Sequence, residues 1–229
     1  MRPLVIAHRG ASRIALENSL AAFKAAGPQG ADGVELDIHA TADGELIVHH
    51  DETIGRTHIA KSTAPAIAAL RLKNGEPVPT LAQALTAIAA RLQVFIEVKT
   101  LDTRWDARLF EIMDRGPNPS GYAVHAFDHR IVRRLSEQRP GLRCGVLSSS
   151  YLVQPLTAMQ DAGASILWQE RTFVDEMLVR MIHDAGKSLF VWTVDRAPDL
   201  ARLVAWGVDG ICSNVPARAR RAVDAPRAA

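Results

Sequence analysis

The sequence predicts an α/β protein, and specifically a (β/α)8 TIM barrel with a small insertion after the second barrel strand. Three observations lead to this fold class. Short apolar runs alternate with segments of helical periodicity along nearly the whole chain, and Gly or Asp stands at the junctions between them. Eight of the runs have the length of buried strands. The chain has 229 residues, close to the ~250 that are typical of such a barrel.

The eight expected barrel strands are short apolar segments that end in polar residues or turns. They cover residues 4–7, 33–38, 94–99, 122–127, 142–147, 165–168, 188–194 and 210–213. Helices are expected between them at residues 16–26, 81–91, 105–113, 130–138, 153–161, 174–185 and 198–206. Gly186 and Gly207 end two of these helices, and Thr80 is placed to cap the helix that begins at residue 81.

Residues 51–79 interrupt the alternation. Before them, residues 46–50 form an accessory hairpin strand after the tight turn signalled by Asp43-Gly44. The segment 51–79 then places Thr, Lys, Pro and Gly around one expected helix at 64–72, a pattern that favours an insertion in a loop. Nothing marks a second domain, so we interpret residues 1–229 as one barrel domain, with residues 217–229 as a solvated, fraying tail.

The composition is that of an ordinary globular protein, with 48% hydrophobic and 23% charged residues. The 27 basic and 25 acidic side chains give a net charge of +2, so no nucleic-acid partner is expected. The two cysteines, Cys144 and Cys212, form neither a disulfide framework nor a zinc motif. The N-terminal apolar run is too short for a signal peptide, and no run approaches the roughly 18 apolar residues of a membrane span. We therefore expect a cytoplasmic protein without stable membrane anchoring.

Charged and imidazole side chains gather where the first three barrel strands and the hairpin end: His8, Arg9, Glu35, Asp37, His50, Glu97 and Lys99. Glu35 and Asp37 alternate along one strand, so they point to the same face about 7 Å apart. Glu97 and Lys99 share a face of the third strand for the same reason. Because the active site of a TIM barrel lies at the C-terminal ends of its strands, these side chains should converge on one mouth.

Each group in this set suits one part of a phosphate chemistry. Three carboxylates without a cysteine cluster suit a hard divalent cation, Mg²⁺ or Ca²⁺, better than zinc. Arg9 and Lys99 suit an anionic substrate, most simply a phosphate. Two histidines beside a metal-bound phosphate can perform general acid–base hydrolysis or transfer. The sequence has no P-loop, G-x-G-x-x-G or G-x-S-x-G motif, which disfavours nucleotide triphosphate, dinucleotide and serine-hydrolase chemistry.

Structural interpretations remain open for several of these residues. Lys99 could simply neutralise Glu97, and Trp192 could be plain barrel core. Four further histidines have no assigned role. His39 is a weak site candidate, His49 is expected at the surface or behind the site, and His125 and His129 could be packing or rim residues.

Ordered motifs along the chain carry a family resemblance. They are His8-Arg9-Gly10-Ala11-Ser12, Glu17-Asn18-Ser19, Glu35-Leu36-Asp37, His50-Asp51, Glu97-Val98-Lys99, Val191-Trp192-Thr193-Val194-Asp195 and the segment 207–216. With these motifs the sequence resembles the glycerophosphodiester phosphodiesterase family, bacterial cytoplasmic type, over residues 4–216. The resemblance implies a (β/α)8 barrel whose small insertion corresponds here to residues 51–79.

The resemblance also implies which residues act and how. Glu35, Asp37 and Glu97 would hold one divalent cation, Mg²⁺ or Ca²⁺. His8 and His50 would be the acid–base pair, one helping an oxygen attack phosphorus and the other protonating the departing alcohol. In this family the attacking oxygen is thought to be the substrate's own glycerol hydroxyl, which gives a cyclic phosphate that water then opens. Which histidine plays which part stays open.

The implied substrate is a small glycerophosphodiester such as glycerophosphocholine or glycerophosphoethanolamine, hydrolysed to glycerol 3-phosphate and an alcohol. Arg9 and Lys99 would bind its phosphate, and Trp192 would form an apolar wall for the glycerol. A homodimer is left open. Ala126-Phe127 departs from the Ser-Phe that often ends the fourth strand in this family, which removes a hydroxyl from the site. Leu16 replaces the usual Pro, and Ser19 a common Thr.

Two other functions are weighed. A lysophospholipase D-like enzyme would need an exposed apolar loop or amphipathic segment at the barrel mouth, and residues 67–72 are too little to argue from. A catalytically silent barrel that serves as a binding module would be favoured by the loss of a histidine or a metal carboxylate, and all five are present.

Overall fold

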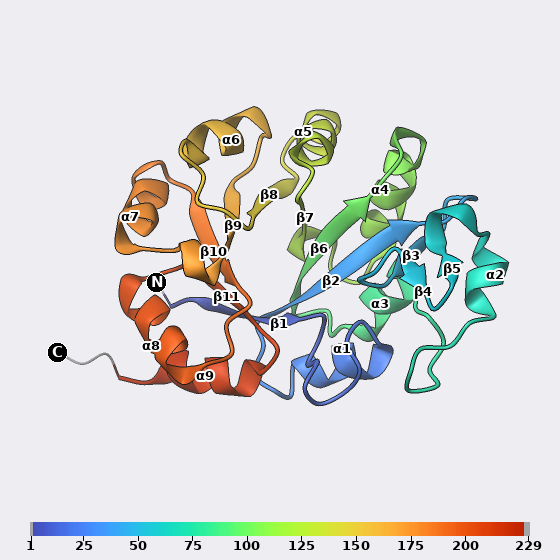
Figure 1. The fold of residues 1–229 in the computed structure, drawn as a ribbon, viewed down its shortest axis with the longest axis horizontal. Coiled ribbons are helices and arrows are strands. Elements are labelled where there is room, and N and C mark those ends of the chain that lie inside the picture. Colours follow the sequence, from blue (N-terminus) through green and yellow to red (C-terminus); the bar gives the residue numbers. More distant parts are fainter. Residues whose placement is uncertain (1, 227–229) are drawn as a thin grey trace.

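Eight parallel strands close into a barrel in the computed structural model, which describes residues 2–226 (Figure 1). The strands are β1 (Leu4–His8), β2 (Gly33–Ala40), β6 (Gln93–Thr100), β7 (Tyr122–Ala126), β8 (Arg143–Ser148), β9 (Ile166–Glu170), β10 (Ser188–Trp192) and β11 (Gly210–Ser213). β1 pairs with both β11 and β2, and this pairing completes the ring. The predicted fold class is confirmed.

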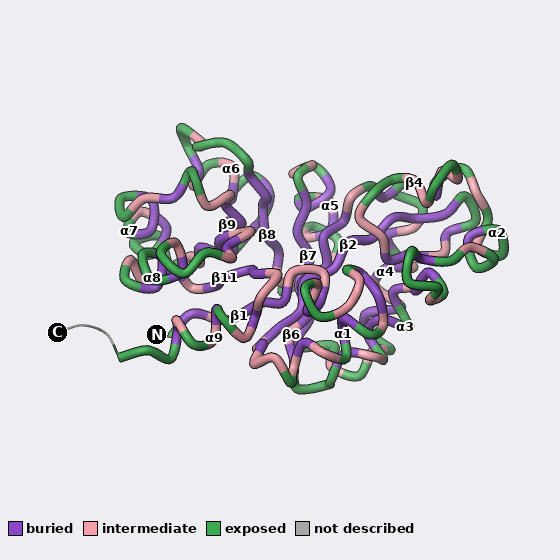
Figure 2. The backbone as a smooth tube through the Cα atoms, turned by 60° about the horizontal axis from the view of Figure 1, so that its bottom comes forward, coloured by how far each residue is buried: buried purple, intermediate pink, exposed green. Residues whose placement is uncertain are grey.

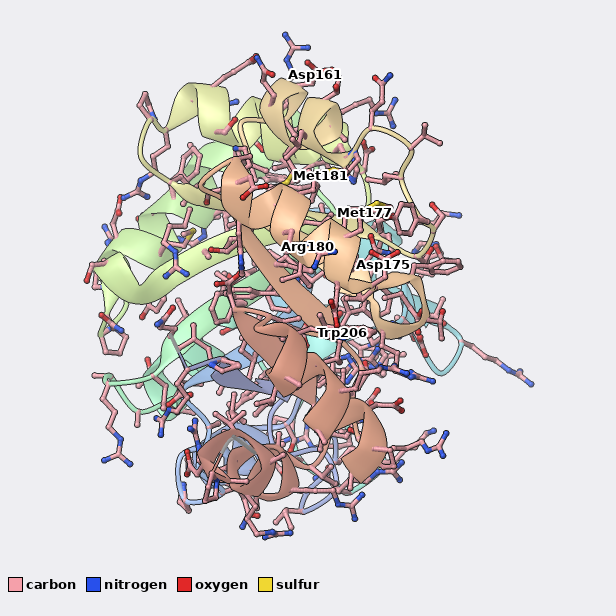
Figure 3. All side chains as sticks on the ribbon, turned by 90° about the vertical axis from the view of Figure 1, so that its left-hand side faces the viewer. Asp161, Asp175, Met177, Arg180, Met181 and Trp206 are labelled. Carbon is pink, nitrogen blue, oxygen red and sulfur yellow. The ribbon has the colours of Figure 1, made fainter. Side chains whose placement is uncertain are left out.

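Helices surround the strands on the outside of the barrel (Figure 1). They are α1 (Leu20–Ala26), α3 (Leu81–Ala87), α4 (Asp106–Arg115), α5 (His129–Gln138), α6 (Pro155–Asp161), α7 (Glu176–Asp184), α8 (Ala197–Trp206) and α9 (Pro216–Asp224). Short 3₁₀ turns precede or join some of them: η2 (Thr103–Trp105), η3 (Pro119–Gly121) and η4 (Arg171–Phe173). Figure 3 looks onto this outer layer, where α7 carries Met177, Arg180 and Met181 and α8 ends at Trp206.

Local side-chain chemistry fixes where several helices begin. The predicted Thr80 cap is confirmed, because its hydroxyl accepts from the Gln83 amide while the Gln83 side chain accepts from the Thr80 amide. Helix α1 begins later than predicted, at Leu20. Asn18 has a positive φ of 55°, which no helix tolerates, and Ser19 caps the helix from outside.

The predicted fraying tail is wrong for its first part. Residues 216–224 form α9, which begins with Pro216 at its first helical position and packs against α8 and β1. Ala219 and Val223 are buried in these contacts, and Arg220 pairs with Asp32. Arg218, Arg220 and Arg221 occupy one side of this amphipathic helix. Residues 227–229 of the expected tail lie outside the described residues.

Two apolar layers make the core. The inner layer fills the barrel and consists of Ile6, Phe95, Ala123, Leu147, Ile166, Trp168, Phe190 and Cys212. The larger outer layer lies between the strands and the helices and includes Val34, Leu36, Val94, Ile96 and Leu167. In Figure 2 the barrel strands are largely buried, and the exposed residues lie mainly on the loops and helices around them. The inner layer closes the barrel, so polar side chains further along the strands must face its mouth.

The insertion after β2 folds around a small core of its own. It comprises β3 (Leu46–Val48), β4 (Thr53–Ile54), β5 (Thr57–His58), η1 (Ile59–Lys61) and α2 (Ala64–Ala68). In Figure 1 this segment lies to the right of β2. β3 pairs antiparallel with β2, and Ile47, Ile59 and Ile67 form the centre of the small core. The predicted helix at 64–72 is shorter, ending at Ala68. Within residues 2–226, no helix has the length and apolar character needed to cross a membrane.

Candidate active site

One cavity of about 240 Å³ collects most of the residues singled out from the sequence. Its lining includes seven of them, from five different strands or strand ends: His8, Arg9, Glu35, His50, Glu97, Lys99 and Trp192. Asp37 is 1% exposed and lies behind them, in contact with Arg9 and Lys99. All eight side chains therefore lie in or directly behind one cavity, among them the seven that were predicted to converge from the strand ends.

Asp37 is held by three donors. Lys99 Nζ lies 3.0 Å from Oδ1 and Arg9 Nε lies 3.3 Å from Oδ2. The Asn18 amide donates a hydrogen bond of 2.7 Å to Oδ2. Burial raises the pKa of Asp37, but the charges of Lys99 and Arg9 outweigh burial and leave that pKa below its usual value. Asp37 is therefore a stable anion that fixes the two cations at the mouth.

Glu35 and Glu97 are in the opposite electrostatic situation. Burial, and then repulsion from Asp37, raises the pKa of Glu97 to about 7, although Lys99 Nζ lies 2.5 Å from its Oε1. Burial, followed by repulsion from Asp37 and Glu97, raises the pKa of Glu35 well above its usual value. Glu35 Oε2 accepts from the Arg9 amide at 3.0 Å, whereas its buried Oε1 has no hydrogen-bond partner within residues 2–226. These two carboxyl groups need more positive charge than the chain supplies.

His125, which the sequence analysis left open as a packing or rim residue, completes a group of side chains that could hold a metal ion. One ligand atom each from Glu35, Glu97 and His125 lies within 4.8 Å of the others, and all three residues are buried. Burial lowers the pKa of His125 to about 3, so its imidazole is neutral, the form that binds a metal. This set of carboxylate oxygens and one neutral nitrogen, which includes the unpartnered Glu35 Oε1, fits a divalent cation.

His8 is oriented by residues from the end of β11. Its Nδ1 donates to Asn214 Oδ1 at 2.8 Å, and the Asn214 amide donates to Asp195 Oδ2 at 2.8 Å. Because Asp195 fixes the orientation of the Asn214 amide, the oxygen faces His8 and the imidazole proton sits on Nδ1. Burial, and then the charge of Arg9, lowers the pKa of His8. The result is a neutral imidazole with a free lone pair on Nε2.

His50 reaches the cavity from the start of the insertion. Its Nδ1 lies 2.8 Å from Asp51 Oδ1, and His39 Nε2 donates to the His50 carbonyl at 3.1 Å. His39 therefore supports the backbone of His50 rather than lining the cavity. His49 turns to the Asp51 carbonyl, at 2.9 Å, and lines a neighbouring cavity of about 610 Å³ beside the insertion. His129 binds the Leu147 carbonyl outside the lining.

Arg9 and the aromatic residues shape the rest of the mouth. Arg9 has a φ of 55°, an uncommon conformation for a residue with a side chain. It is held there because its amide donates to Glu35 Oε2 and its carbonyl accepts from the Asn18 amide. Phe127 and Trp192 form an edge-to-face pair with ring centroids 5.6 Å apart. One wall of the cavity is therefore aromatic.

The sequence interpretation gave no role to several residues that the structure places in or beside the site. Asp195 and Asn214 lie within the C-terminal motifs, but nothing in their spacing indicates that they reach His8, more than 180 residues earlier in the chain. For His125 a signal existed. It lies two residues after Ala123, which faces the barrel interior, and it pairs with Glu97 on the neighbouring strand.

Fold and site together define a phosphodiester-cleaving hydrolase on a TIM barrel. Comparison with known proteins gives the particular family. The model of the glycerophosphoryl diester phosphodiesterase family matches residues 8–218, and the chain belongs to this family. Both the family and the class of enzyme expected from the sequence motifs are confirmed.

Individual relatives agree with this placement. A glycerophosphodiester phosphodiesterase of Caldanaerobacter subterraneus subsp. tengcongensis is 33% identical over 94% of this chain and 96% of its own length. The crystal structure of a glycerophosphodiester phosphodiesterase from Parabacteroides distasonis is 25% identical, with a TM-score of 0.86 over 97% of each chain. An Oleispira antarctica phosphodiesterase, solved in complex with its product sn-glycerol-3-phosphate, is similar in fold, with a TM-score of 0.89 at 24% identity over 98% of each chain.

Proposed function

We propose that the protein hydrolyses glycerophosphodiesters, of the glycerophosphocholine or glycerophosphoethanolamine type, to glycerol 3-phosphate and an alcohol. The observation that carries the proposal is that one cavity combines the cationic side chains of Arg9 and Lys99 with two histidines. Each of these histidines, His8 and His50, is oriented through its Nδ1. The complex of the Oleispira relative with sn-glycerol-3-phosphate supports the same product class.

Arg9 and Lys99 bind the phosphate in this proposal, and the aromatic wall of Phe127 and Trp192 faces the carbon atoms of the glycerol. Both cations are anchored to Asp37, so their side chains are already ordered before the substrate arrives. This arrangement leaves guanidinium and ammonium hydrogens for the phosphate oxygens.

His8 is the general base and His50 the general acid of the first step. His8 Nε2 takes the proton of the glycerol 2-hydroxyl while that oxygen bonds to phosphorus. The bond from phosphorus to the alcohol oxygen breaks, and protonated His50 gives its Nε2 proton to that oxygen. The neutral, buried state of His8 suits a base, and the Asp51 carboxylate, 2.8 Å from Nδ1 of His50, orients the imidazole of His50.

The second step opens the cyclic phosphate with the two roles reversed. His50 takes a proton from water as the water oxygen bonds to phosphorus. His8 returns its proton to the glycerol 2-oxygen as the ring bond breaks, which yields glycerol 3-phosphate and restores both histidines.

We propose Glu35, Asp37 and Glu97 as the residues that hold one divalent cation. Its positive charge would stabilise the phosphate's developing negative charge. The raised pKa values of Glu35 and Glu97 support this assignment, since they mark a site that lacks positive charge.

Release of glycerol 3-phosphate from glycerophosphocholine and glycerophosphoethanolamine tests the proposal. The purified protein is assayed with Mg²⁺, Ca²⁺, Mn²⁺ and EDTA, beside His8→Ala and Glu35→Gln. His183→Ala is the matched control, since His183 pairs with Asp209 outside the cavity. We expect turnover that requires metal, His8 and Glu35 but not His183. Absence of turnover by folded, metal-loaded protein on every phosphodiester tested would contradict the proposal.

Lysophospholipids are a second candidate substrate class, and one observation favours them. Large apolar side chains are exposed on the loops that follow β7, β8 and β9: Phe127, Tyr151, Val153 and Phe173. These loops surround the mouth, and Val153 is 92% exposed. Lysophosphatidylcholine is therefore added as a third substrate; cleavage faster than that of glycerophosphocholine would assign the enzyme to lysophospholipids.

A further inference from the structure

The side chain of His125 lies close enough to Glu35 and Glu97 to share a cation with them. It sits on β7 directly opposite Glu97 of β6, and Glu97 sits opposite Asp37 of β2. Ligand atoms of Glu35, Glu97 and His125 come within 4.8 Å of one another. Two donors that share an ion at about 2.1 Å lie at most ~4.2 Å apart, so small side-chain rotations complete the contact.

His125 is also held rigidly in that position. Its ring stacks on Trp168 with a centroid distance of 4.3 Å and an interplanar angle of 8°. Gly145 on β8 makes room for the stack, because a Cβ there would lie 2.6 Å from Trp168 Cδ1 and 3.2 Å from His125 Cβ. The ring is thus fixed by packing, as a preorganised ligand requires.

Packing alone leaves the polar atoms of this ring unexplained. The His125 side chain is 1% exposed, and its Nδ1 has no hydrogen-bond partner within residues 2–226. The nearby Glu35 Oε1 is likewise buried and unpaired. A buried polar atom without a partner destabilises the folded state, so a phenylalanine would serve a purely apolar stack better. Two unpartnered buried ligand atoms within one cluster of Glu35, Glu97 and His125 point to a cation site.

We infer that His125 is a ligand of the divalent cation, and that its nitrogen makes this centre prefer Mn²⁺, Co²⁺ or Zn²⁺ to Mg²⁺ and Ca²⁺. The inference rests on the metal site of the proposed function. Imidazole suits transition metals, whereas an all-oxygen set suits Mg²⁺ and Ca²⁺. The neutral ring adds a donor without adding negative charge to a site where Arg9 and Lys99 already balance part of the carboxylate charge.

Pulsed EPR of the Mn²⁺-loaded protein tests the inference without using activity. A directly bound imidazole nitrogen gives a ¹⁴N modulation of the Mn²⁺ signal. We expect this modulation in the wild type and in His8→Gln, which removes another imidazole of the cavity. It should disappear in His125→Phe, which keeps the aromatic stack on Trp168 but removes the donor. Calorimetry should show Mn²⁺ affinity falling about 10- to 100-fold in His125→Phe, with Mg²⁺ affinity changing less.

Two results would overturn the inference. Mn²⁺ bound without ¹⁴N modulation in the wild type, or with unchanged affinity in His125→Phe, would return His125 to a packing role and leave the carboxylate site standing. No Mn²⁺ binding at all would overturn both the ligand and the metal site. Glycerol 3-phosphate release in EDTA then shows separately whether the phosphodiesterase activity stands. His183→Gln, outside the cavity, controls for the loss of any histidine.

Discussion

Asn214 Oδ1 accepts a hydrogen bond of 2.8 Å from His8 Nδ1, and this contact joins the end of β11 to the end of β1 across the closing seam of the barrel. Ser12 donates to the same oxygen at 2.9 Å, and Asp195 holds the amide from the other side. The contact keeps the proton of His8 on Nδ1 and leaves Nε2 free toward the cavity. Asn214 thus orients the imidazole of His8, the proposed base.

Asn214→Ala should lower kcat about 10- to 100-fold with little change in KM, because the imidazole loses its tautomer and orientation while the phosphate contacts remain. Asn214→Asp separates this role from a structural one. A carboxylate at that position stabilises protonated His8 and should move the acidic limb of the pH–rate profile upward. Ser12→Ala is the control, with a small effect expected. An unchanged pH profile in Asn214→Asp would remove Asn214 from the mechanism.

In the pH profile of kcat/KM, the midpoint of the acidic limb should lie below the usual histidine pKa of ~6.5. Burial, and then the charge of Arg9, lowers the pKa of His8. A base acts while it is unprotonated, so activity persists as the pH decreases and is lost only when His8 gains its proton. Arg9→Gln removes the second cause and should shift the limb to higher pH, besides raising KM. A limb above 6.5 in the wild type would contradict the base role of His8.

Glu35→Gln should stabilise the metal-free protein while it abolishes metal binding. Burial and two neighbouring carboxylates raise the pKa of Glu35, so the folded state binds a proton that the unfolded state releases above its ordinary pKa of 4.5. Stability is therefore lost as the pH rises above 4.5, and Gln removes this loss. We expect Tm in EDTA to rise by about 2–4 °C, or ~1 kcal/mol, with a larger gain at pH 8 than at pH 5. A lower Tm at pH 8 would show that the carboxylate stabilises the fold.

Gly10→Ala should destabilise the protein strongly. Gly10 has a φ of 82°, and an added Cβ would lie 2.7 Å from the Ala22 carbonyl carbon and 2.8 Å from its Cβ. Gly55→Ala is the matched control, since its φ is 61° but nothing lies within 4 Å of its added Cβ. In urea denaturation we expect a loss of ~1 kcal/mol for Gly55→Ala and at least twice that for Gly10→Ala. Equal losses would show that the contact of the Gly10 loop with α1 is soft.

Strand parity explains why so much of the site follows from sequence. Glu35 and Asp37, like Glu97 and Lys99, alternate along buried strands, and the barrel rule directs their shared face to one mouth. What parity cannot give is the partner of each group. That Asp37 contacts both Lys99 and Arg9 could not be read from parity, because distances across the barrel depend on the packing of several strands.

The remaining differences have local physical reasons. Helix α9 was missed because its arginines dominate the composition, whereas its buried residues are Pro216, Ala219 and Val223. The start of α1 depends on the positive φ of Asn18, which periodicity does not reveal. His125 was left open because a histidine in a strand has many packing roles, and only the Trp168 stack and the carboxylates around it distinguish among them.

The measurement that tests the central claim most directly compares two leaving groups. Glycerophosphocholine needs an acid to protonate its departing choline, whereas the p-nitrophenyl ester of glycerol 3-phosphate releases a stable anion without one. We expect His50→Ala to lose about 10²- to 10⁴-fold on glycerophosphocholine. Its single-turnover release of p-nitrophenol from the p-nitrophenyl ester, which reports the first step alone, should stay within about tenfold of the wild type. His8→Ala should lose activity on both substrates. Rescue of His8→Ala instead of His50→Ala by the p-nitrophenyl ester would contradict the assignment of base and acid.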